Sequence, residues 1–202
     1  MSPLIPTILD HLFPDPPIPL HHTNPFSFLV AVMLSAQCTD VKVNQVTPLL
    51  FESGNTPWHL LELGHARIEQ ILKPLGLYKT KARNIVSLCQ ILIDKYEGNI
   101  PNTLEELKSL PGVGHKTASC VVSQIFKIPA FAVDTHIHRL AKKWNLSQAR
   151  TVEETEKDLK ELFAKETWNR RHLQIIYYAR AYCPARAHDI NRCPICKALS
   201  LN

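Results

Sequence analysis

The amino-acid sequence predicts an all-α protein built from two helical domains. Apolar residues recur at helical spacing through most of the 202 residues. Residue types that commonly cap helices (Thr, Asn and Asp) precede several of these segments. Only residues 130–133, Ala-Phe-Ala-Val, resemble a strand, and four residues are too few to form a sheet.

The expected helices follow one another with short loops. Asn24 caps the first clear segment, which has Pro25 at its first position, and Thr39 or Asp40 opens the next. A short helix starts at Thr56, and Thr103 begins the pattern of a capping box with Glu106. Further helices are expected over 66–73, 79–96, 114–127, 135–144, 151–165 and 167–182.

Two proline-containing segments are the best candidates for domain boundaries. They lie at residues 14–19 and at residues 128–130, Ile-Pro-Ala. They delimit a central helical block, with an N-terminal helix and the C-terminal third outside it.

Charge favours a polyanionic partner only slightly. The formal net charge is +5, and residues 165–197 contain seven Lys or Arg against two acidic residues. A modest excess of this kind is equally typical of a solvated surface. There is no apolar run long enough to span a membrane, and the proline-rich N-terminus does not have the form of a signal peptide.

A cytoplasmic location is therefore expected, with the six cysteines as free thiols or metal ligands. Cys38, Cys89 and Cys120 fall in apolar segments and are predicted to be small buried residues.

Residues 110–118, Leu-Pro-Gly-Val-Gly-His-Lys-Thr-Ala, are the most informative segment. Gly112 and Gly114 are expected to adopt positive φ angles in a tight turn, and a helix then begins near Gly114. The unpaired N–H groups of a helix start attract anions such as phosphate. A plain glycine turn between two helices is the alternative.

Lys116 lies in the first turn of that expected helix. The helix dipole and partial burial both favour its neutral amine, which can attack a sugar carbon and form a Schiff base. The alternative is a surface lysine that contacts phosphate. Asp134 is an expected N-cap whose carboxylate could also stabilise a sugar cation. His136 and His138 are two residues apart, so on a helix they do not face one another, and a shared metal is not expected.

With these residues in place, the chain resembles the endonuclease III family of helix-hairpin-helix DNA glycosylases. The matching strings run in the family's order and cover nearly the whole chain. They are residues 34–40 (Leu-Ser-Ala-Gln-Cys-Thr-Asp), 76–78 (Gly-Leu-Tyr), 110–118 and 133–137 (Val-Asp-Thr-His-Ile).

The resemblance implies a six-helix domain over about 20–128 and a second helical domain made of 1–19 and 129–202, with a DNA-binding cleft between them. It implies that Lys116 is the nucleophile and that Asp134 assists base departure. Gln37 and Leu77 match positions that fill the gap left by an extruded nucleotide, although a core leucine is equally compatible with the sequence at position 77. The implied DNA-binding residues are Gln37, Leu77, Leu110, Gly112, Val113, Gly114 and His115, where His115 replaces the family's usual Arg or Lys.

The resemblance also implies a C-terminal [4Fe–4S] cluster held by four cysteines, separated by six, two and five residues. Here Cys183, Cys193 and Cys196 are separated by nine and two residues, and Asn202 stands at the fourth position. Three alternatives remain open. The cluster is lost, or a non-cysteine group such as the Asn202 terminus completes it, or His188 joins the three cysteines in a zinc site.

The implied function is that of a bifunctional DNA glycosylase and abasic-site lyase in base-excision repair. The expected substrate is double-stranded DNA with oxidised pyrimidines or abasic sites, the expected state is a monomer, and no membrane partner is expected. A monofunctional mismatch glycosylase and a non-catalytic helix-hairpin-helix DNA-binding protein are the alternatives. Lys116 argues against the first alternative and Asp134 against the second.

Overall fold

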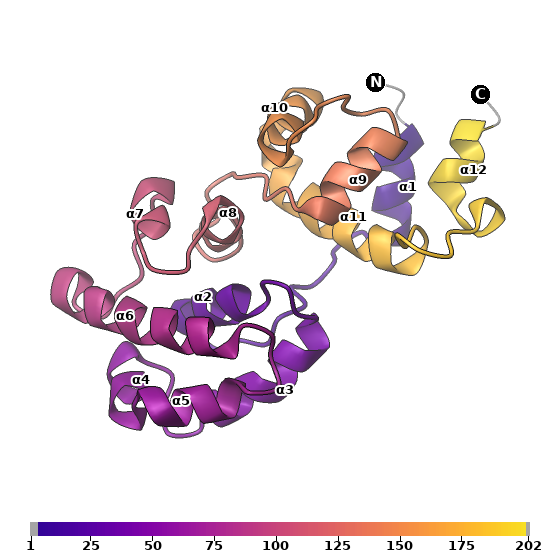
Figure 1. Cartoon of the computed structure of the whole chain (residues 1–202). Helices are drawn as coiled ribbons and strands as arrows, with labels where there is room; N and C mark the ends of the chain where they lie inside the picture. Colours follow the sequence, from indigo (N-terminus) through magenta and orange to yellow (C-terminus); the bar gives the residue numbers. More distant parts are fainter. Residues whose placement is uncertain (1–3, 201–202) are drawn as a thin grey trace. The chain divides into compact units, whose positions relative to one another are not determined.

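The structure, a computed structural model, describes residues 4–200 (Figure 1). These residues form twelve α-helices, two short 3-10 segments and loops, which confirms the predicted all-α class. They divide into two compact units. Residues 18–128 form one, called here the central unit, and the residues up to 17 together with those from 129 onward form the other, called the terminal unit. Among the described helices, none has both the length and the apolar composition needed to cross a bilayer.

The central unit contains seven α-helices, against the six implied by the family resemblance. Two of the seven are separated by a single residue, Gly64, whose φ is 78°. The helices are α2 (Pro25–Leu34), α3 (Asp40–Leu50), α4 (Pro57–Leu63), α5 (His65–Leu72), α6 (Tyr78–Tyr96), α7 (Leu104–Lys108) and α8 (His115–Gln124).

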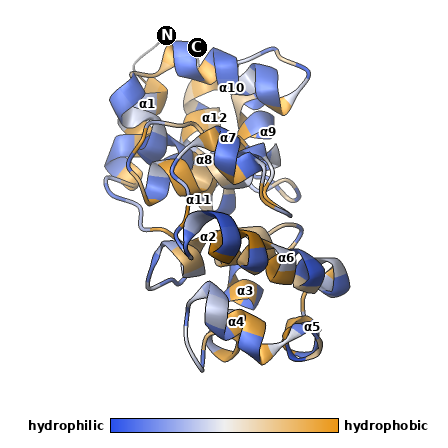
Figure 2. Cartoon of the chain, turned by 90° about the vertical axis from the view of Figure 1, so that its left-hand side faces the viewer, coloured by the Kyte–Doolittle hydropathy of each residue, from blue (hydrophilic) through white to orange (hydrophobic). Residues whose placement is uncertain are grey.

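Helix α2 lies in the core of the central unit. Every residue of α2 after Pro25 is buried, which is expected for a helix that is apolar on all sides. It begins as predicted, with Pro25 at its first position and a reciprocal capping box between Asn24 and Ser27. Helices α4 and α5 pack against α6. Hydrophobic and hydrophilic residues alternate along these helices, as amphipathic packing requires (Figure 2).

The terminal unit combines the first helix with the last third of the chain. Residues 194–200, which follow the last helix expected from the sequence, form a further helix that has Pro194 at its first position. The elements are α1 (Leu4–Leu12), α9 (Thr135–Lys143), α10 (Val152–Leu162), η1 (Lys165–Thr167), α11 (Trp168–Ala181), η2 (Ile190–Arg192) and α12 (Pro194–Ser200).

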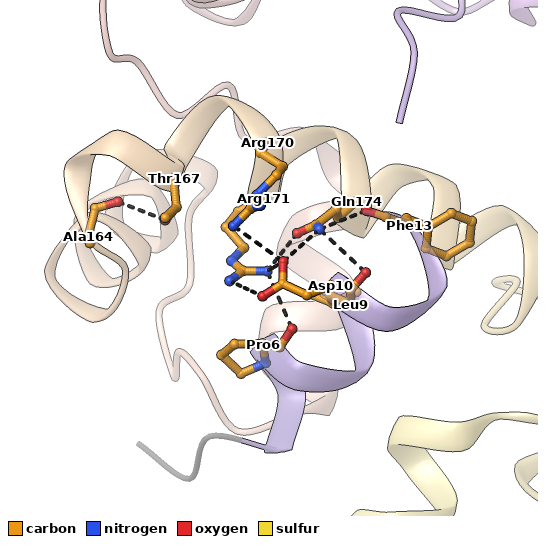
Figure 3. A network of polar contacts seen from close by, with 9 residues as sticks. All are labelled: Pro6, Leu9, Asp10, Phe13, Ala164, Thr167, Arg170, Arg171 and Gln174. Atoms are coloured by element: carbon orange, nitrogen blue, oxygen red, sulfur yellow. Dashed lines mark hydrogen bonds and ion pairs between the residues drawn. The ribbon is translucent and has the colours of Figure 1, made fainter. Parts of the chain in front are cut away.

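A polar network fastens α1 to α11 inside the terminal unit (Figure 3). Arg171 is buried, and its guanidinium donates to both carboxylate oxygens of Asp10 at 2.8 and 2.9 Å. Gln174 donates to the same carboxylate at 3.0 Å and to the carbonyl oxygen of Phe13 at 2.8 Å. This bidentate geometry makes the ion pair stronger than an ordinary surface pair.

We expect this network to make the free energy of unfolding depend on pH. The hydrogen bond from Arg171, assisted by Gln174 and by the charge of Arg170, holds the pKa of Asp10 below its usual value. A lowered carboxyl pKa contributes stability above the pKa of the unfolded chain, and this contribution is lost as pH falls through the folded pKa. Denaturant unfolding of wild type and Asp10→Asn across the acidic range should show a smaller acid loss in the variant. Equal slopes would contradict the assignment.

The three cysteines outside the C-terminal segment were predicted to be buried. Cys89 and Cys120 are buried, and burial raises the pKa of the Cys89 thiol to about 12, which makes it unreactive. The prediction is wrong for Cys38, which is only half-buried. Cys38 lies in a loop and not in a helix, and its sulfur is 3.2 Å from the ammonium of Lys81.

Candidate functional site

The segment between α7 and α8 forms the predicted hairpin. Residues 110–113 make a turn in which the N–H of Val113 donates to the carbonyl oxygen of Leu110 at 3.1 Å. Pro111 follows Leu110, and Gly112 has a φ of 77°, which is the pattern of a type II turn. The side chains of Leu110 and Val113 are both buried. These two residues therefore anchor the hairpin from within, and the hairpin presents backbone to the outside.

Gly114 does not have the positive φ that was expected. Its φ is −84° and its ψ is 175°, an extended conformation open to any residue. The reason is its place as N-cap of α8, since that position requires extended backbone. Gly114 has no side chain with which to cap α8, and the helix dipole places positive partial charge at this end.

The two glycines should therefore respond differently to substitution. A Cβ at Gly112 would meet the Asn84 amide nitrogen at 2.8 Å and the Met33 methyl carbon at 2.9 Å, on a backbone with positive φ. Gly112→Ala should lower the free energy of unfolding by at least about 1–2 kcal/mol. Gly114→Ser, where no atom lies within 4 Å of an added Cβ and serine can cap the helix, should be nearly neutral. Equal losses in thermal unfolding would contradict the turn assignment.

His115 and Lys116 occupy the first two positions of α8, and both are half-buried. The helix dipole places positive partial charge at this end, which disfavours an ammonium group and attracts anions. The rest of α8, residues 118–124, is buried and holds this first turn in place. Lys116 is thus a half-buried lysine at an anion-attracting helix start.

Asp134 caps α9 in the terminal unit, as predicted. Its Oδ1 accepts hydrogen bonds from the backbone N–H groups of His136 and Ile137, both at 2.9 Å. Among the described residues no hydrogen bond reaches its Oδ2. The side chain is half-buried, so one carboxylate oxygen is fixed by the helix and the other remains for a different partner.

The segment before Asp134 is buried and contacts α11. Residues 130–133 are at most 2% exposed, and the carbonyl oxygen of Ala132 lies 2.6 Å from the Nδ1 of His172 on α11. Helix α9 packs against α11 as well. The Nδ1 of His138 lies 2.7 Å from the hydroxyl of Thr155, which joins α9 to α10. Packing against α11 therefore holds both the segment before Asp134 and the helix that follows it.

Gln37 and Leu77 share an unusual backbone conformation. Their φ angles are 56° and 58°, in the left-handed region that residues other than glycine rarely adopt. Gln37 is exposed, and Leu77 is 58% exposed, which excludes the core alternative for this leucine. Strained, exposed residues of this kind often belong to binding sites.

Lys81 is a residue that the sequence analysis missed. It is buried at the start of α6, and its ammonium donates to the carbonyl oxygen of Ala36 at 2.9 Å. The backbone N–H of Lys81 also donates to the carbonyl oxygen of Leu77. Lys81 therefore connects the Leu77 turn to the loop that contains Gln37. Position 81 lies four residues after Leu77, on the apolar face of α6, and a lysine there was the available signal.

These loops of the central unit meet the hairpin around one small cavity. The cavity is lined by Met33, Ala36, Leu77, Lys81, Asn84 and Gly112, among others. Three segments of the central unit therefore line the same cavity. They are the loop that contains Ala36, next to Gln37, the Leu77 turn and the Gly112 turn of the hairpin.

The C-terminal cysteines gather with a histidine in the terminal unit. The potential ligand atoms of Cys183, His188, Cys193 and Cys196 all lie within 4.8 Å of one another, a set that could hold a metal ion. Burial, together with the charges of Lys143 and Arg139, lowers the pKa of His188. Asn202, the other expected candidate for a fourth ligand, lies outside the described residues.

Comparison with known proteins gives a consistent result. The sequence profile of the HhH-GPD superfamily of base excision DNA repair proteins matches residues 30–165. Endonuclease III of Rickettsia prowazekii is 43% identical over 182 residues, which cover 90% of this chain and 86% of that protein.

Two solved structures are also similar. A non-covalent endonuclease III–DNA complex matches with a TM-score of 0.91 and 42% identity, covering 97% of this chain and 95% of that one. A trapped endonuclease III–DNA covalent intermediate matches with a TM-score of 0.90 and 44% identity, covering 94% and 89%. The chain therefore belongs to the endonuclease III family within the HhH-GPD superfamily of base excision DNA repair proteins.

Proposed function

We propose that this protein is a bifunctional DNA glycosylase and abasic-site lyase. It removes oxidised pyrimidines from double-stranded DNA and then cleaves the abasic strand by β-elimination. The proposal includes a monomeric state. It also includes a cytoplasmic location, as the bacterial origin of its relatives suggests. The observation that carries it is the likeness, at 44% identity, to a structure in which endonuclease III is covalently joined to DNA.

The hairpin is the proposed phosphate-binding element. The N-terminus of α8, with the positive partial charge of its helix dipole, lies next to the Gly112 turn, and phosphate groups bind at helix starts of this kind. Gly114 and His115 contribute backbone here, while the buried side chains of Leu110 and Val113 keep the turn in shape. A histidine carries a full positive charge only when it is protonated, whereas an arginine is always charged. Phosphate binding by this hairpin therefore depends more on backbone N–H groups than it would with an arginine at position 115.

Lys116 is the proposed nucleophile. Its neutral amine attacks C1′ of the damaged nucleotide, and the bond from C1′ to the base breaks as the base leaves with its electron pair and takes up a proton. Loss of the amine proton and opening of the sugar ring give a Schiff base at C1′. Removal of a C2′ proton then expels the 3′ phosphate, and water finally releases Lys116.

Asp134 is the proposed electrostatic partner of these steps. Two backbone N–H groups bind its Oδ1 and hold the carboxylate in place, so that Oδ2 can face the positive charge that develops on the sugar. The same carboxylate is suited to accept and return protons during the later steps.

Gln37 and Leu77 are the proposed side chains that fill the gap in the duplex. Extruding a nucleotide costs a few kcal/mol of lost stacking and pairing, and a side chain inserted in its place offsets part of that cost. Both residues are exposed on tight left-handed turns, and Lys81 joins these turns, so the two side chains can act as one preformed element.

The function can be tested with purified protein and end-labelled duplexes that contain thymine glycol or an abasic site. We expect base release from the first duplex and strand cleavage of both, with an unsaturated aldehyde at the 3′ end. Undamaged duplex of the same sequence is the control. Base release without cleavage would indicate a monofunctional glycosylase, and binding without either product would indicate a DNA-binding module. Both outcomes would contradict the proposal.

A further inference from the structure

We propose that this chain binds a single zinc ion at the place where the family resemblance implies an iron–sulfur cluster. The ligands are Cys183, His188, Cys193 and Cys196. Four residues separate His188 from each of its two flanking cysteines, and two residues separate the last two cysteines. Three thiolates and one imidazole form a set that structural zinc sites use.

The distances fit one ion at the centre of four ligands. With zinc–sulfur bonds of about 2.3 Å, neighbouring sulfur atoms of a tetrahedral site lie about 3.8 Å apart. The sulfur atoms of Cys183 and Cys196 are 3.9 Å apart, and all four ligand atoms lie within 4.8 Å of one another. A cubane cluster does not fit so compact a set, because each of its ligands binds a different iron atom at a different corner.

His188 has the geometry of a ligand. Its Nε2 is buried, and it has no hydrogen-bond partner among the described residues. A buried nitrogen without a partner costs free energy unless something binds it. Ala187, directly before it, has a φ of 55°, a strained conformation that turns the chain at this point. A metal ion on Nε2 accounts for both features.

The three sulfur atoms are enclosed and supported. Cys183 and Cys193 are fully buried, and Cys196 is 6% exposed. The hydroxyl of Tyr178 accepts a hydrogen bond from the N–H of Ile195 at 2.8 Å and lies 3.3 Å from the sulfur of Cys193. A metal-bound thiolate has no proton, so at a zinc site this hydroxyl donates to the sulfur. Outer hydrogen bonds of this kind orient and stabilise metal-bound thiolates.

The surrounding charges also fit. Zinc with three thiolates and a neutral imidazole carries a net charge of −1, and Arg139 donates to the carbonyl oxygen of Cys183 at 2.6 Å. The ammonium of Lys143 lies 2.9 Å from the Nδ1 of His188. Zinc on Nε2 leaves the ring proton on Nδ1. Two donors cannot form a hydrogen bond with each other, so the exposed Lys143 side chain turns to solvent when the metal binds. Lys143→Gln, whose amide oxygen can accept that proton, should then bind zinc at least as tightly.

Metal analysis of the full-length protein tests the proposal. The protein is produced in medium that supplies both iron and zinc and is purified without chelators. We expect one zinc per chain, negligible iron and no visible charge-transfer absorbance. The cobalt-substituted protein should show the intense absorption of a tetrahedral site with thiolate ligands. A brown protein with stoichiometric iron would overturn the proposal, as would a protein without zinc whose C-terminal thiols all react with a thiol reagent.

Variants test the fourth ligand separately. His188→Ala should weaken zinc binding at least about tenfold, since the loss of an outer-shell partner alone typically costs that much. His65→Ala, which removes an exposed histidine in the central unit, should bind zinc like wild type. If His188→Ala does not fold, His188→Cys should keep zinc and shift the cobalt spectrum toward that of a four-thiolate site.

A chain that ends at Ser200 should also keep its zinc, because it retains all four proposed ligands. Loss of zinc from this shortened chain, or an unchanged cobalt spectrum in His188→Cys, would overturn the assignment of His188.

Discussion

Lys116→Ala should abolish the covalent adduct that borohydride traps between this protein and abasic DNA. Reduction of the Schiff base fixes the protein to C1′, so a chain without the amine at position 116 cannot form that bond. Strand cleavage should fall to background in the same variant. The measurement is the shift of labelled DNA on a denaturing gel after treatment with borohydride.

Two comparisons make this result specific to the amine. Lys108→Ala removes an exposed lysine of α7 in the same unit and should trap DNA like wild type. Binding of undamaged duplex by Lys116→Ala should weaken far less than trapping, since the hairpin backbone remains. If Lys116→Ala still forms the adduct at the wild-type rate, another residue is the nucleophile.

Asp134→Asn should reduce base release by about 10²–10⁴-fold while the fold survives. Asparagine caps helices as well as aspartate does, so the bonds to His136 and Ile137 can persist. What the variant loses is the negative charge. At a helix start this loss lowers the free energy of unfolding by about 0.3–2 kcal/mol. The same charge is central to proton transfer and to the stabilisation of a sugar cation. Single-turnover kinetics on thymine glycol DNA and thermal unfolding measure the two effects independently.

Thr151→Ala provides the matched cap control in the same unit. Thr151 caps α10 in a reciprocal capping box with Glu154, so its loss should cost about 0.5–2 kcal/mol of stability and leave base release unchanged. A large stability loss with little kinetic effect in Asp134→Asn would mean that Asp134 only caps α9.

The sequence was most informative where a short segment determines its own structure. The caps at Asn24, Thr103 and Asp134 all accept the expected backbone N–H groups, because capping depends on residues two or three positions away. The Leu-Pro-Gly-Val turn followed in the same way from proline and glycine preferences. Gly114 was mispredicted because its place at the helix start, and not its residue type, determines its φ.

Features that depend on distant segments could not be read from the sequence. Asp10 and Arg171 are 161 residues apart in sequence, and no local pattern connects them. The burial of Lys81 depends on how α6 packs against the loop after α2. His188 was one of several candidates for a fourth ligand, and only the folded chain brings its ring to the three sulfur atoms.

Identification of the trapped residue is the most direct test of the catalytic proposal. Wild-type protein is reduced with borohydride on abasic duplex, digested with a protease, and the peptide that carries the DNA remnant is sequenced by mass spectrometry. We expect a single modified residue, Lys116, in the peptide that includes the start of α8. A modified residue elsewhere, or no adduct from active protein, would contradict the assignment of Lys116 as the nucleophile.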